Sequence, residues 1–388
     1  MKVQEVPGDT DVAGSRTDRH QASVVIPGNR ECCRVFLCAR PSRRMRAADY
    51  APCRACLYNP ALTFSCLANS VLLIRGLHNL RAAHRDCVAT IGNFDGVHLG
   101  HQAVLAALTE RARAAGVPSL VITFEPQPME FFRPEQAPAR LTRLREKLEA
   151  ISHCGVDRVL LIRFDAGFAA VDAQDFVHSI LVERLGIRHL YVGDDFRFGR
   201  DRAGDFALLR AAGLQHGFGV ESLATVAEAG CRVSSTRIRE ALQQGDLAHA
   251  EACLGRRYRI CGRVAHGNKH GRTIGFPTIN IPLLRRSTPL RGVFAVQVLG
   301  LADTPLPGVA NIGNRPTLAG DDRFLLEVHL FDFAEQVYGR HVEIDFVERI
   351  RDEQKFESFD ALRTQIQHDV QRAHVIHRSD MLTHRKSG

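Results

Sequence analysis

Apolar and polar positions divide the chain into three parts with different periodicities. The first 70 residues show no sustained period of 2 or 3.6, and short apolar patches lie among Arg, Pro, Ser and Gly. From there to about residue 225, apolar runs typical of buried strands alternate with stretches of helical periodicity. After about residue 250 the apolar runs are short and are separated by Gly, Pro or Asn. We therefore expect an extension over 1–70, a domain over 71–252 and a second domain over 253–388.

The middle segment has the pattern of a parallel sheet covered by helices. Its predicted strands are almost continuously apolar, as expected when both faces of a sheet are buried, and they cover 87–92, 119–124, 157–164 and 188–193. Helical periodicity lies between and after these strands, over 100–115, 141–155, 172–186 and 204–213. Gly116 follows the first helix as a stop signal, and Asp172 opens the third as an acidic cap. This alternation predicts an α/β domain with helices on both sides of a parallel sheet.

The C-terminal segment predicts a small antiparallel domain. Five predicted strands follow one another with no helix between them, over 256–267, 292–300, 305–313, 324–333 and 341–350. A single helix, over 358–374, follows the last of them. We expect a small antiparallel barrel or sandwich with this C-terminal helix docked on it.

Composition excludes several classes of protein. No apolar stretch approaches the ~18–20 residues of a membrane helix, and the N-terminus has no apolar signal region, so we expect a cytoplasmic protein with no membrane partner. The chain has 51 Lys+Arg against 43 Asp+Glu, and only five of the basic residues are lysines. None of these lysines follows a glycine, which excludes the Walker A loop of P-loop enzymes.

The first 70 residues hold six of the eleven cysteines, with 10 Lys+Arg against 6 Asp+Glu. Cys53 and Cys56 have the spacing of half a zinc or redox site, but the other four cysteines do not supply a second pair at suitable spacing. We expect reduced thiols here. The segment is predicted to be a disordered tail or upstream sequence included by a start-site error.

The first candidate site is the segment TIGNFDGVHLGH (90–101), which leaves a predicted strand and enters a helix. A helix N-terminus at this point favours an anion. His98 and His101 share one face of the first helical turn and can donate hydrogen bonds to phosphate oxygens. Three glycines stand four residues apart, which differs from the dinucleotide GxGxxG pattern but lets the backbone approach a ligand closely: Gly92, Gly96 and Gly100.

These motifs resemble those of a known family. HLGH matches the HxGH signature of the nucleotidyltransferase superfamily. The longer string TIGNFDGVHLGH, with TFEPQP (123–128), GDDFRFG (193–199) and SSTRIR (234–239), resembles the adenylyltransferase module of prokaryotic bifunctional riboflavin kinase/FAD synthetase. The resemblance covers roughly residues 72–375. It implies a Rossmann-like nucleotidyltransferase domain followed by a riboflavin kinase barrel.

In that family the first module transfers AMP from ATP to the phosphate of FMN and releases pyrophosphate. By the resemblance, His98 and His101 stabilise charge on the α-phosphate, and Arg239 stabilises the departing pyrophosphate. The residues expected to bind nucleotide or flavin are Gly92, Asn93, Phe94, Asp95, Gly96, Gly100, Asp195, Ser234, Ser235 and Thr236.

The roles of four positions in this module stay open. Asp95 and Asp195 either orient the nucleotide or Mg²⁺ or cap turns. Arg237 either binds a ligand or is a solvated helix arginine. Gln127 stands where many family members have histidine, and because glutamine cannot carry a proton we assign it no catalytic role.

The second candidate site lies in GRVAHGNKHGRTIGFPTIN (262–280). Thr278 and Asn280 are two residues apart on an extended segment, so their side chains face the same way. A hydroxyl and an amide oxygen side by side suit Mg²⁺ that bridges phosphates. Further on, LEVH places Glu327 and His329 on one face of a strand, where alternation alone predicts an outward-facing carboxylate.

The family resemblance gives these residues roles. PTIN resembles the Pro-Thr-Ala-Asn motif of riboflavin kinases, and the match extends to GVFAV (292–296), GVANIGNRPT (308–317) and LEVHLFDF (326–333). It implies that Glu327 takes the proton from the riboflavin 5′-hydroxyl, whose oxygen attacks the γ-phosphate of ATP. Ile279 replaces the alanine and is expected to be tolerated because its side chain points to the opposite face. Further substrate-binding residues are expected at Gly271, Thr273 and Asn311.

The predicted function is therefore a two-step synthesis, from riboflavin to FMN and from FMN to FAD, with ATP as a substrate of each step and Mg²⁺ as a cofactor. One alternative keeps a single working active site, with the other module only binding flavin. A second alternative is nucleic-acid binding. It is disfavoured because residues 71–388 carry 41 basic against 37 acidic groups and no basic run flanked by aromatic residues. The sequence does not determine the oligomeric state, or whether FMN passes directly between the sites.

Overall fold

The computed structural model describes residues 71–222, 226–228, 230–267, 275–283, 285, 287–315 and 323–386. All of them belong to one compact unit of the chain, Cys66–Gly388. The predictions for residues 1–70, including Cys53 and Cys56, lie outside the described residues, as do those for Gly271 and Thr273. Within the described ranges, every helix is too short or too polar to cross a bilayer.

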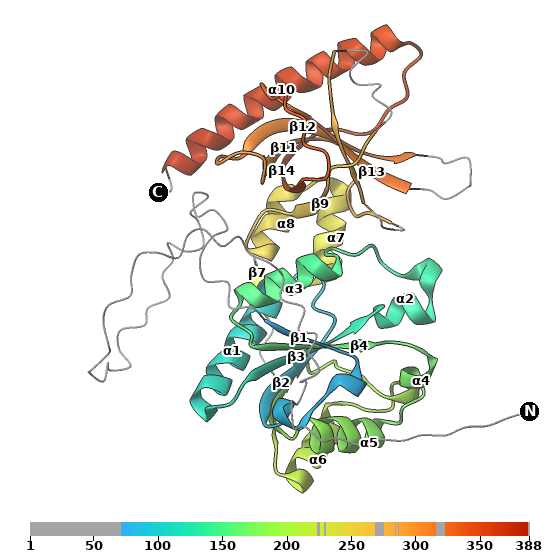
Figure 1. Cartoon of the computed structure of the whole chain (residues 1–388), viewed down its shortest axis with the longest axis vertical. Coiled ribbons are helices and arrows are strands. Elements are labelled where there is room, and N and C mark those ends of the chain that lie inside the picture. The colour runs from blue at the N-terminus through green and yellow to red at the C-terminus, as the bar shows by residue number, and fades with distance from the viewer. Residues whose placement is uncertain are drawn as a thin grey trace, which may run out of the picture. The chain divides into compact units, whose positions relative to one another are not determined.

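The first domain is built on a six-stranded parallel sheet (Figure 1). Its strands lie across the sheet in the order β1-β4-β3-β2-β5-β6, and every neighbouring pair is parallel. The chain therefore leaves β2 toward β3 and β4, and returns to the other side of β2 with β5. Ligands of such sheets bind beyond the carboxyl ends of the strands at this reversal. The strands are β1 (Leu72–Arg75), β2 (Cys87–Ile91), β3 (Ser119–Glu125), β4 (Arg158–Arg163), β5 (Ile187–Val192) and β6 (Gly219–Ser222).

Helices cover both faces of this sheet, as predicted. On one face, α1 (Leu99–Ala115) and α3 (Leu144–His153) bury Leu105, Leu108 and Ile151. On the other face, the π-helix η5 (Phe176–Arg184) and α6 (Phe206–His216) belong to a second hydrophobic cluster. The shorter helices are α2 (Pro128–Phe132), α4 (Ala166–Ala169), α5 (Ala173–Asp175), η2 (Leu77–Asn79), η3 (Ala82–His84), η4 (Pro134–Gln136) and η6 (Arg200–Arg202).

Two predicted helices have a different start or form in the structure. The helix expected over 141–155 begins only at Leu144, and the backbone N–H groups of Leu141 and Thr142, just before it, donate to the Asp95 carboxylate. The helix expected over 172–186 begins with α5, where Asp172 accepts from the backbone N–H of Gln174 (3.0 Å). It continues as η5 rather than as a regular α-helix.

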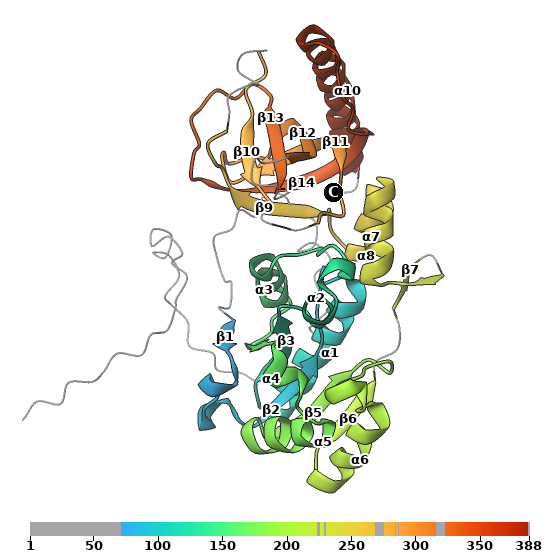
Figure 2. The same cartoon turned by 90° about the vertical axis from the view of Figure 1, so that its right-hand side faces the viewer.

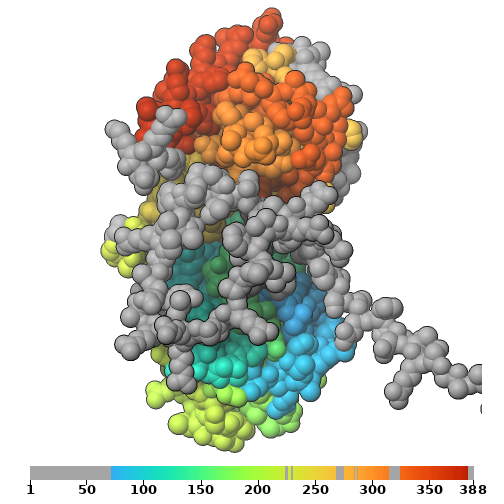
Figure 3. Space-filling view, turned by 60° about the vertical axis from the view of Figure 1, so that its left-hand side comes forward, coloured from blue at the N-terminus to red at the C-terminus, as the bar shows by residue number. Residues whose placement is uncertain are grey.

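The strand β1 is an addition that the hydrophobic pattern did not predict. With four residues it is too short for its periodicity to be recognised. It pairs with β4 at the edge of the sheet, and Leu72 at its start is 47% exposed. This edge appears in blue at the surface in Figure 3.

Two helices follow the parallel sheet along the chain, α7 (Ser235–Gln244) and α8 (Leu247–Leu254). Neither lies in a range that the hydrophobic pattern predicted as a helix. Their buried residues, among them Ile238 and Leu254, lie in the same hydrophobic cluster as the interior of the C-terminal domain. A short antiparallel pair, β7 (Ala227–Glu228) and β8 (Cys231–Arg232), precedes them.

The second domain is a nearly closed antiparallel barrel of six strands (Figure 2). Their order is β10-β13-β12-β11-β14-β9. The backbone N–H of Ala265 donates to the carbonyl of Asn280 (2.7 Å), which brings the chain after β9 back to β10. The strands are β9 (Arg259–Arg263), β10 (Ile279–Pro282), β11 (Gly292–Leu299), β12 (Leu306–Arg315), β13 (Arg323–Leu330) and β14 (His341–Arg351).

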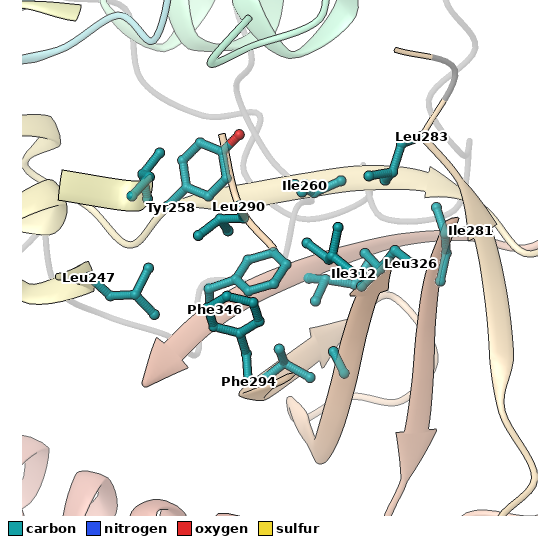
Figure 4. Packing of buried hydrophobic residues seen from close by; sticks show 14 of the residues in the cluster. Leu247, Tyr258, Ile260, Ile281, Leu283, Leu290, Phe294, Ile312, Leu326 and Phe346 are labelled. Carbon is teal, nitrogen blue, oxygen red and sulfur yellow. The ribbon is translucent and has the colours of Figure 1, made fainter. Parts of the chain in front are cut away.

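The barrel is filled by side chains from every strand (Figure 4). Phe294 and Phe346 meet edge to face, with their ring centroids 5.3 Å apart. Outside the barrel, α10 (Phe359–Lys386) packs Ala373 and Ile376 against residues of β11 and β12. The predicted C-terminal helix is therefore present, and it runs beyond residue 374. The expected strands are confirmed, and β10 adds one that was predicted only as an extended segment.

Candidate functional site

Residues 92–98, called the signature loop below, connect the central strand β2 to the N-terminus of α1. Phe94, Asp95 and Val97 are buried in it, and Phe94, Gly96 and Val97 have positive φ angles of 48°, 85° and 42°. Such angles are rare for phenylalanine and valine and are concentrated at functional sites. A Cβ at Gly96 would lie 2.8 Å from the Leu141 side chain, so glycine is required here for close packing as well as for its backbone angle. The loop is thus strained and tightly held at the carboxyl edge of the sheet.

The two predicted histidines lie together at the start of α1. Their rings stack with centroids 3.7 Å apart, and a Cβ at Gly100 would lie 3.2 Å from the His98 ring. Burial lowers the pKa of His98 to about 4, an effect that Asp95 opposes and that Arg256, Arg232 and Arg239 reinforce. Burial also lowers the pKa of His101 well below its usual value, and the neighbouring His98 and Lys147 add to this lowering. Both imidazoles are therefore neutral near pH 7.

The neutral state of His98 has a defined tautomer. His98 is the N-cap of α1, and its Nδ1 accepts a hydrogen bond from the backbone N–H of His101 (3.3 Å). A backbone N–H can only donate, so Nδ1 is unprotonated and the ring proton is on Nε2. His98 therefore has one N–H to donate, on the nitrogen that does not cap the helix.

Asp95 joins the signature loop to two distant segments. Its buried carboxylate accepts from the backbone N–H groups of Leu141 (3.0 Å) and Thr142 (3.0 Å) and from the Arg239 guanidinium (2.6 Å). Arg239 in turn donates its Nε to the carbonyl of Ala139 (2.6 Å). Of the two roles open for Asp95, this geometry favours capping over direct contact with a nucleotide. The hydrogen bonds to Asp95 and Ala139 also occupy part of the Arg239 donors, which were expected to bind pyrophosphate.

The serines at the start of α7 lie against the signature loop. Ser234 is the N-cap of α7 and accepts from the backbone N–H of Arg237 (3.3 Å), while Ser235 donates its hydroxyl to the carbonyl of Asp95 (2.9 Å). Thr236 is exposed. Arg237 is half-buried, and its Nη1 is buried without a hydrogen-bond partner among the described residues. That environment differs from that of a solvated helix arginine.

The other predicted residues of this module lie at the same edge of the sheet. Asn93, which follows β2, is exposed, and so is Asp195, which follows β5 and pairs with Arg232 at 3.4 Å. Gln127 caps α2 and is 7% exposed, and its Nε2 has no hydrogen-bond partner in the described part of the chain. Sequence reasoning missed Lys147, which is fully buried on α3. No sequence signal marked it, because lysine at a helical position is usually exposed.

In the barrel, strand register places three predicted residues in one row. Glu327 on β13 lies directly opposite Asn280 on β10 and directly opposite Asn311 on β12. Cross-strand partners of this kind have their side chains on the same face of the sheet. Glu327 is half-buried, in keeping with a carboxylate at a site rather than one fully exposed to solvent.

Asn280 has an unpaired acceptor beside Glu327. Its Nδ2 donates to the carbonyl of Thr278 (3.5 Å), and its Oδ1 is buried without a hydrogen-bond partner among the described residues. Nearby, the ring of His329 bonds through Nδ1 to the carbonyl of Pro277 (2.8 Å) and meets the Phe276 ring edge to face. An orphaned amide oxygen at this position fits a cation ligand.

Comparison with known proteins agrees with this division into two modules. The family model for FAD synthetase matches residues 80–237, and that for riboflavin kinase matches residues 254–377. The bifunctional riboflavin kinase/FMN adenylyltransferase of Escherichia coli (strain K12) is 55% identical over 298 residues, which cover 76% of this chain and 95% of that protein. The protein of the same name from Pseudomonas fluorescens is 54% identical over 304 residues, covering 78% and 97%.

A solved structure also spans both modules. The crystal structure titled as a macrolide-efflux protein from Streptococcus pneumoniae is 30% identical, with a TM-score of 0.66, and covers 77% of this chain and 97% of that one. The family resemblance that the sequence motifs carried is confirmed by these matches. The chain belongs to the family of bifunctional riboflavin kinase/FMN adenylyltransferases.

Proposed function

We propose that this chain phosphorylates riboflavin to FMN in the barrel and then adenylylates FMN to FAD in the α/β domain, using ATP in both steps. The observation that carries the proposal is that each module brings together residues suited to its own nucleophile. The stacked, neutral His98–His101 pair lies at a helix N-terminus, and the Asn280–Glu327–Asn311 row lies on one face of the barrel. Both sets lie in regions matched by the corresponding family models.

In the adenylyl transfer, a phosphate oxygen of FMN attacks the α-phosphorus of ATP and pyrophosphate leaves. The nucleophile is already an anion, so this step needs charge stabilisation rather than a base. His98 donates from Nε2 to an α-phosphate oxygen, His101 donates beside it, and the N-terminus of α1 adds its dipole. Arg237 and the remaining donor of Arg239 stabilise the charge on the pyrophosphate.

In the phosphorylation, the nucleophile is a neutral alcohol and needs a proton acceptor. Glu327 takes the proton of the riboflavin 5′-hydroxyl while the oxygen attacks the γ-phosphorus of ATP and ADP leaves. The cross-strand neighbours Asn280 and Asn311 lie on either side of this carboxylate and orient the reacting groups.

The residues present fit a magnesium ion in the barrel. Asn280 offers the buried, unpaired Oδ1, and Thr278 is half-buried two residues before it. Mg²⁺ prefers a few protein oxygens together with water and substrate phosphates. In the described residues, no group of three or more His, Cys, Asp or Glu side chains could hold a metal ion. On the strength of these two oxygen groups we assign the ion to Thr278 and Asn280, where it would neutralise charge on the phosphates of ATP.

Incubation of the purified protein with riboflavin, ATP and Mg²⁺, followed by chromatography, tests the proposal. FMN must appear first and FAD second, with ADP and pyrophosphate as the other products. A parallel reaction that starts from FMN isolates the second step. If one product never forms, the corresponding module only binds flavin. We further propose that these reactions take place in the cytoplasm and need neither a nucleic acid nor a membrane.

A further inference from the structure

Lys147 is a buried cation whose ammonium has no hydrogen-bond partner in the part of the chain that the structure describes. It is one of the largest fully buried side chains, with 0% of its surface exposed, and its Nζ has no partner among the described residues. Removing an ammonium group from water without pairing it costs several kcal/mol. A buried, unpaired charge lowers the stability of the fold, so a residue that carries one is a candidate functional residue. The mechanism proposed above for adenylyl transfer does not use Lys147.

The fold places Lys147 behind the signature loop. The segment that precedes α3 is bound to the Asp95 carboxylate through Leu141 and Thr142, and Lys147 lies in the first turn of that helix. Burial lowers the pKa of Lys147, and Asp95, Glu125 and Glu130 oppose this while Arg140 adds to it. The charges of these three carboxylates favour the ammonium form of Lys147, although burial has the larger effect on its pKa.

The charge of Lys147 acts on His101. Together with burial and with His98, it holds the pKa of His101 well below its usual value. The Nδ1 atom of His101 is itself buried and has no hydrogen-bond partner in the described residues. Lys147 Nζ and His101 Nδ1 are thus a buried donor and a buried acceptor, neither has a hydrogen-bond partner among the described residues, and the ammonium charge is near enough to act on the ring.

Among the described residues, no hydrogen bond defines the tautomer of His101 in the way that one does for His98. The ring proton of His98 is held on Nε2 because the helix itself donates to Nδ1. No group in the described residues does the same for His101. A neutral imidazole can donate only from the nitrogen that carries the proton, so an undefined tautomer would cost His101 part of its ability to donate to phosphate.

We propose that Lys147 is a positioning residue of the adenylyl-transfer site, whose ammonium donates to Nδ1 of His101 when ATP is bound and so keeps the ring proton on Nε2. The inference rests on the proposed function of this module. It pairs both orphaned atoms in one hydrogen bond. It also gives the two stacked histidines the same tautomer, so that both Nε2–H groups point toward the α-phosphate. Lys147 acts through His101 and does not touch the substrate.

Lys147→Met removes the charge and keeps the volume, and therefore tests the role. We expect FAD formation from FMN to fall about 10- to 100-fold, as is usual when a group that orients an essential side chain is lost. Riboflavin phosphorylation by the same molecules should stay within twofold. The melting temperature should stay the same or rise, because an unpaired buried charge has been removed. Arg145→Met, on the exposed side of the same helix, is the matched control and should change neither activity.

A double-mutant cycle with His101 separates positioning from a general structural role. In a His101→Ala background, Lys147→Met should cause no further loss of the residual FAD formation, because the residue it acts through is gone. Nitrogen NMR of the histidine ring, with the α,β-methylene analogue of ATP bound, should show His101 as the Nε2–H tautomer in the wild type and as a mixture in Lys147→Met. The His101 signal is assigned by its absence in His101→Ala.

Three results would overturn the inference. The first is FAD formation by Lys147→Met within twofold of the wild type. The second is an equal loss in the presence and absence of His101. The third is a fall in melting temperature accompanied by loss of both activities, which would make Lys147 a structural residue. Failure of the wild type itself to make FAD would instead contradict the proposed function, so the two failures are distinguishable.

Discussion

The carboxylate of Asp95 and the guanidinium of Arg239 lie 2.6 Å apart, although 144 residues separate them in the chain. Their side chains are only 3% and 13% exposed. The pair joins the loop after β2 to the helix α7, and thereby brings two motifs of the sequence into one site. A buried ion pair of this kind is sensitive to the loss of either partner, since the remaining charge is left without compensation.

Asp95→Asn should therefore destabilise the protein. The amide can still accept one backbone N–H, but it leaves Arg239 buried without its counter-charge, and breaking such pairs costs about 3–5 kcal/mol. The midpoint of urea unfolding measures this directly. Asp86→Asn, which breaks an exposed pair with Arg188, is the matched control and should leave the midpoint almost unchanged. Equal shifts in the two variants would contradict a special role for the buried pair.

His98→Ala should abolish most FAD formation from FMN while riboflavin phosphorylation continues. Loss of one preorganised donor to a developing charge typically lowers the rate ~10²–10³-fold. Separate assays of the two steps on the same preparation measure the effect. His216→Ala, at the exposed end of α6, should leave both steps unchanged. If FAD formation persists within a fewfold of the wild type, His98 does not contact the reacting phosphate.

Glu327→Gln should lower FMN production ~10²–10⁴-fold, because the amide keeps the shape of the side chain but cannot take the hydroxyl proton. FAD production from supplied FMN should continue at the wild-type rate. The measurement is initial-rate chromatography of each product, with the exposed Glu335→Gln as a control. Loss of both activities together would point to misfolding of the barrel rather than to the loss of a base.

Stability should depend on pH through His98. Its pKa is about 4 in the folded chain and near 6.5 in the unfolded chain, so the unfolded state binds more protons between these values. The contribution of neutral His98 is complete above about pH 6.5 and is lost as the pH falls toward 4, for a total of about 3 kcal/mol. The free energy of unfolding of the wild type should therefore fall more steeply over this range than that of His98→Gln. Parallel curves would show that His98 titrates normally in the folded protein.

A chain that begins at Val71 should keep both activities and the melting temperature of the full-length protein. The described fold begins with β1, and the two family models match residues 80–237 and 254–377. The preceding sequence shows no periodicity that would bury apolar area and offset the entropy of ordering it. Loss of either activity on truncation would contradict this and would revive a metal site at Cys53 and Cys56.

The local features of both domains could be predicted from the sequence because they depend on neighbouring residues. Leu105, Leu108 and Ala112 recur with helical spacing and are buried in α1, and Gly116 ends that helix with a positive φ angle. The signature loop could be found from the sequence, because its residues follow one another between a predicted strand and a predicted helix. Short strands could not be recognised in this way. For example, β1 and β10 have four residues each, which are too few to show a period of hydrophobic positions.

The relations between distant residues were decided only by tertiary structure. The sequence allowed two roles for Asp95, binding a ligand or capping a turn. Its hydrogen-bond partners lie on α7 and on the segment before α3, which only the fold brings near it. The row of Asn280, Glu327 and Asn311 depends on strand register, which pairing across the barrel determines. Lys147 has the sequence context of an exposed helical lysine, yet in the tertiary structure none of its surface is exposed. Sequence patterns report the faces of single elements, whereas burial and register depend on how elements pack together.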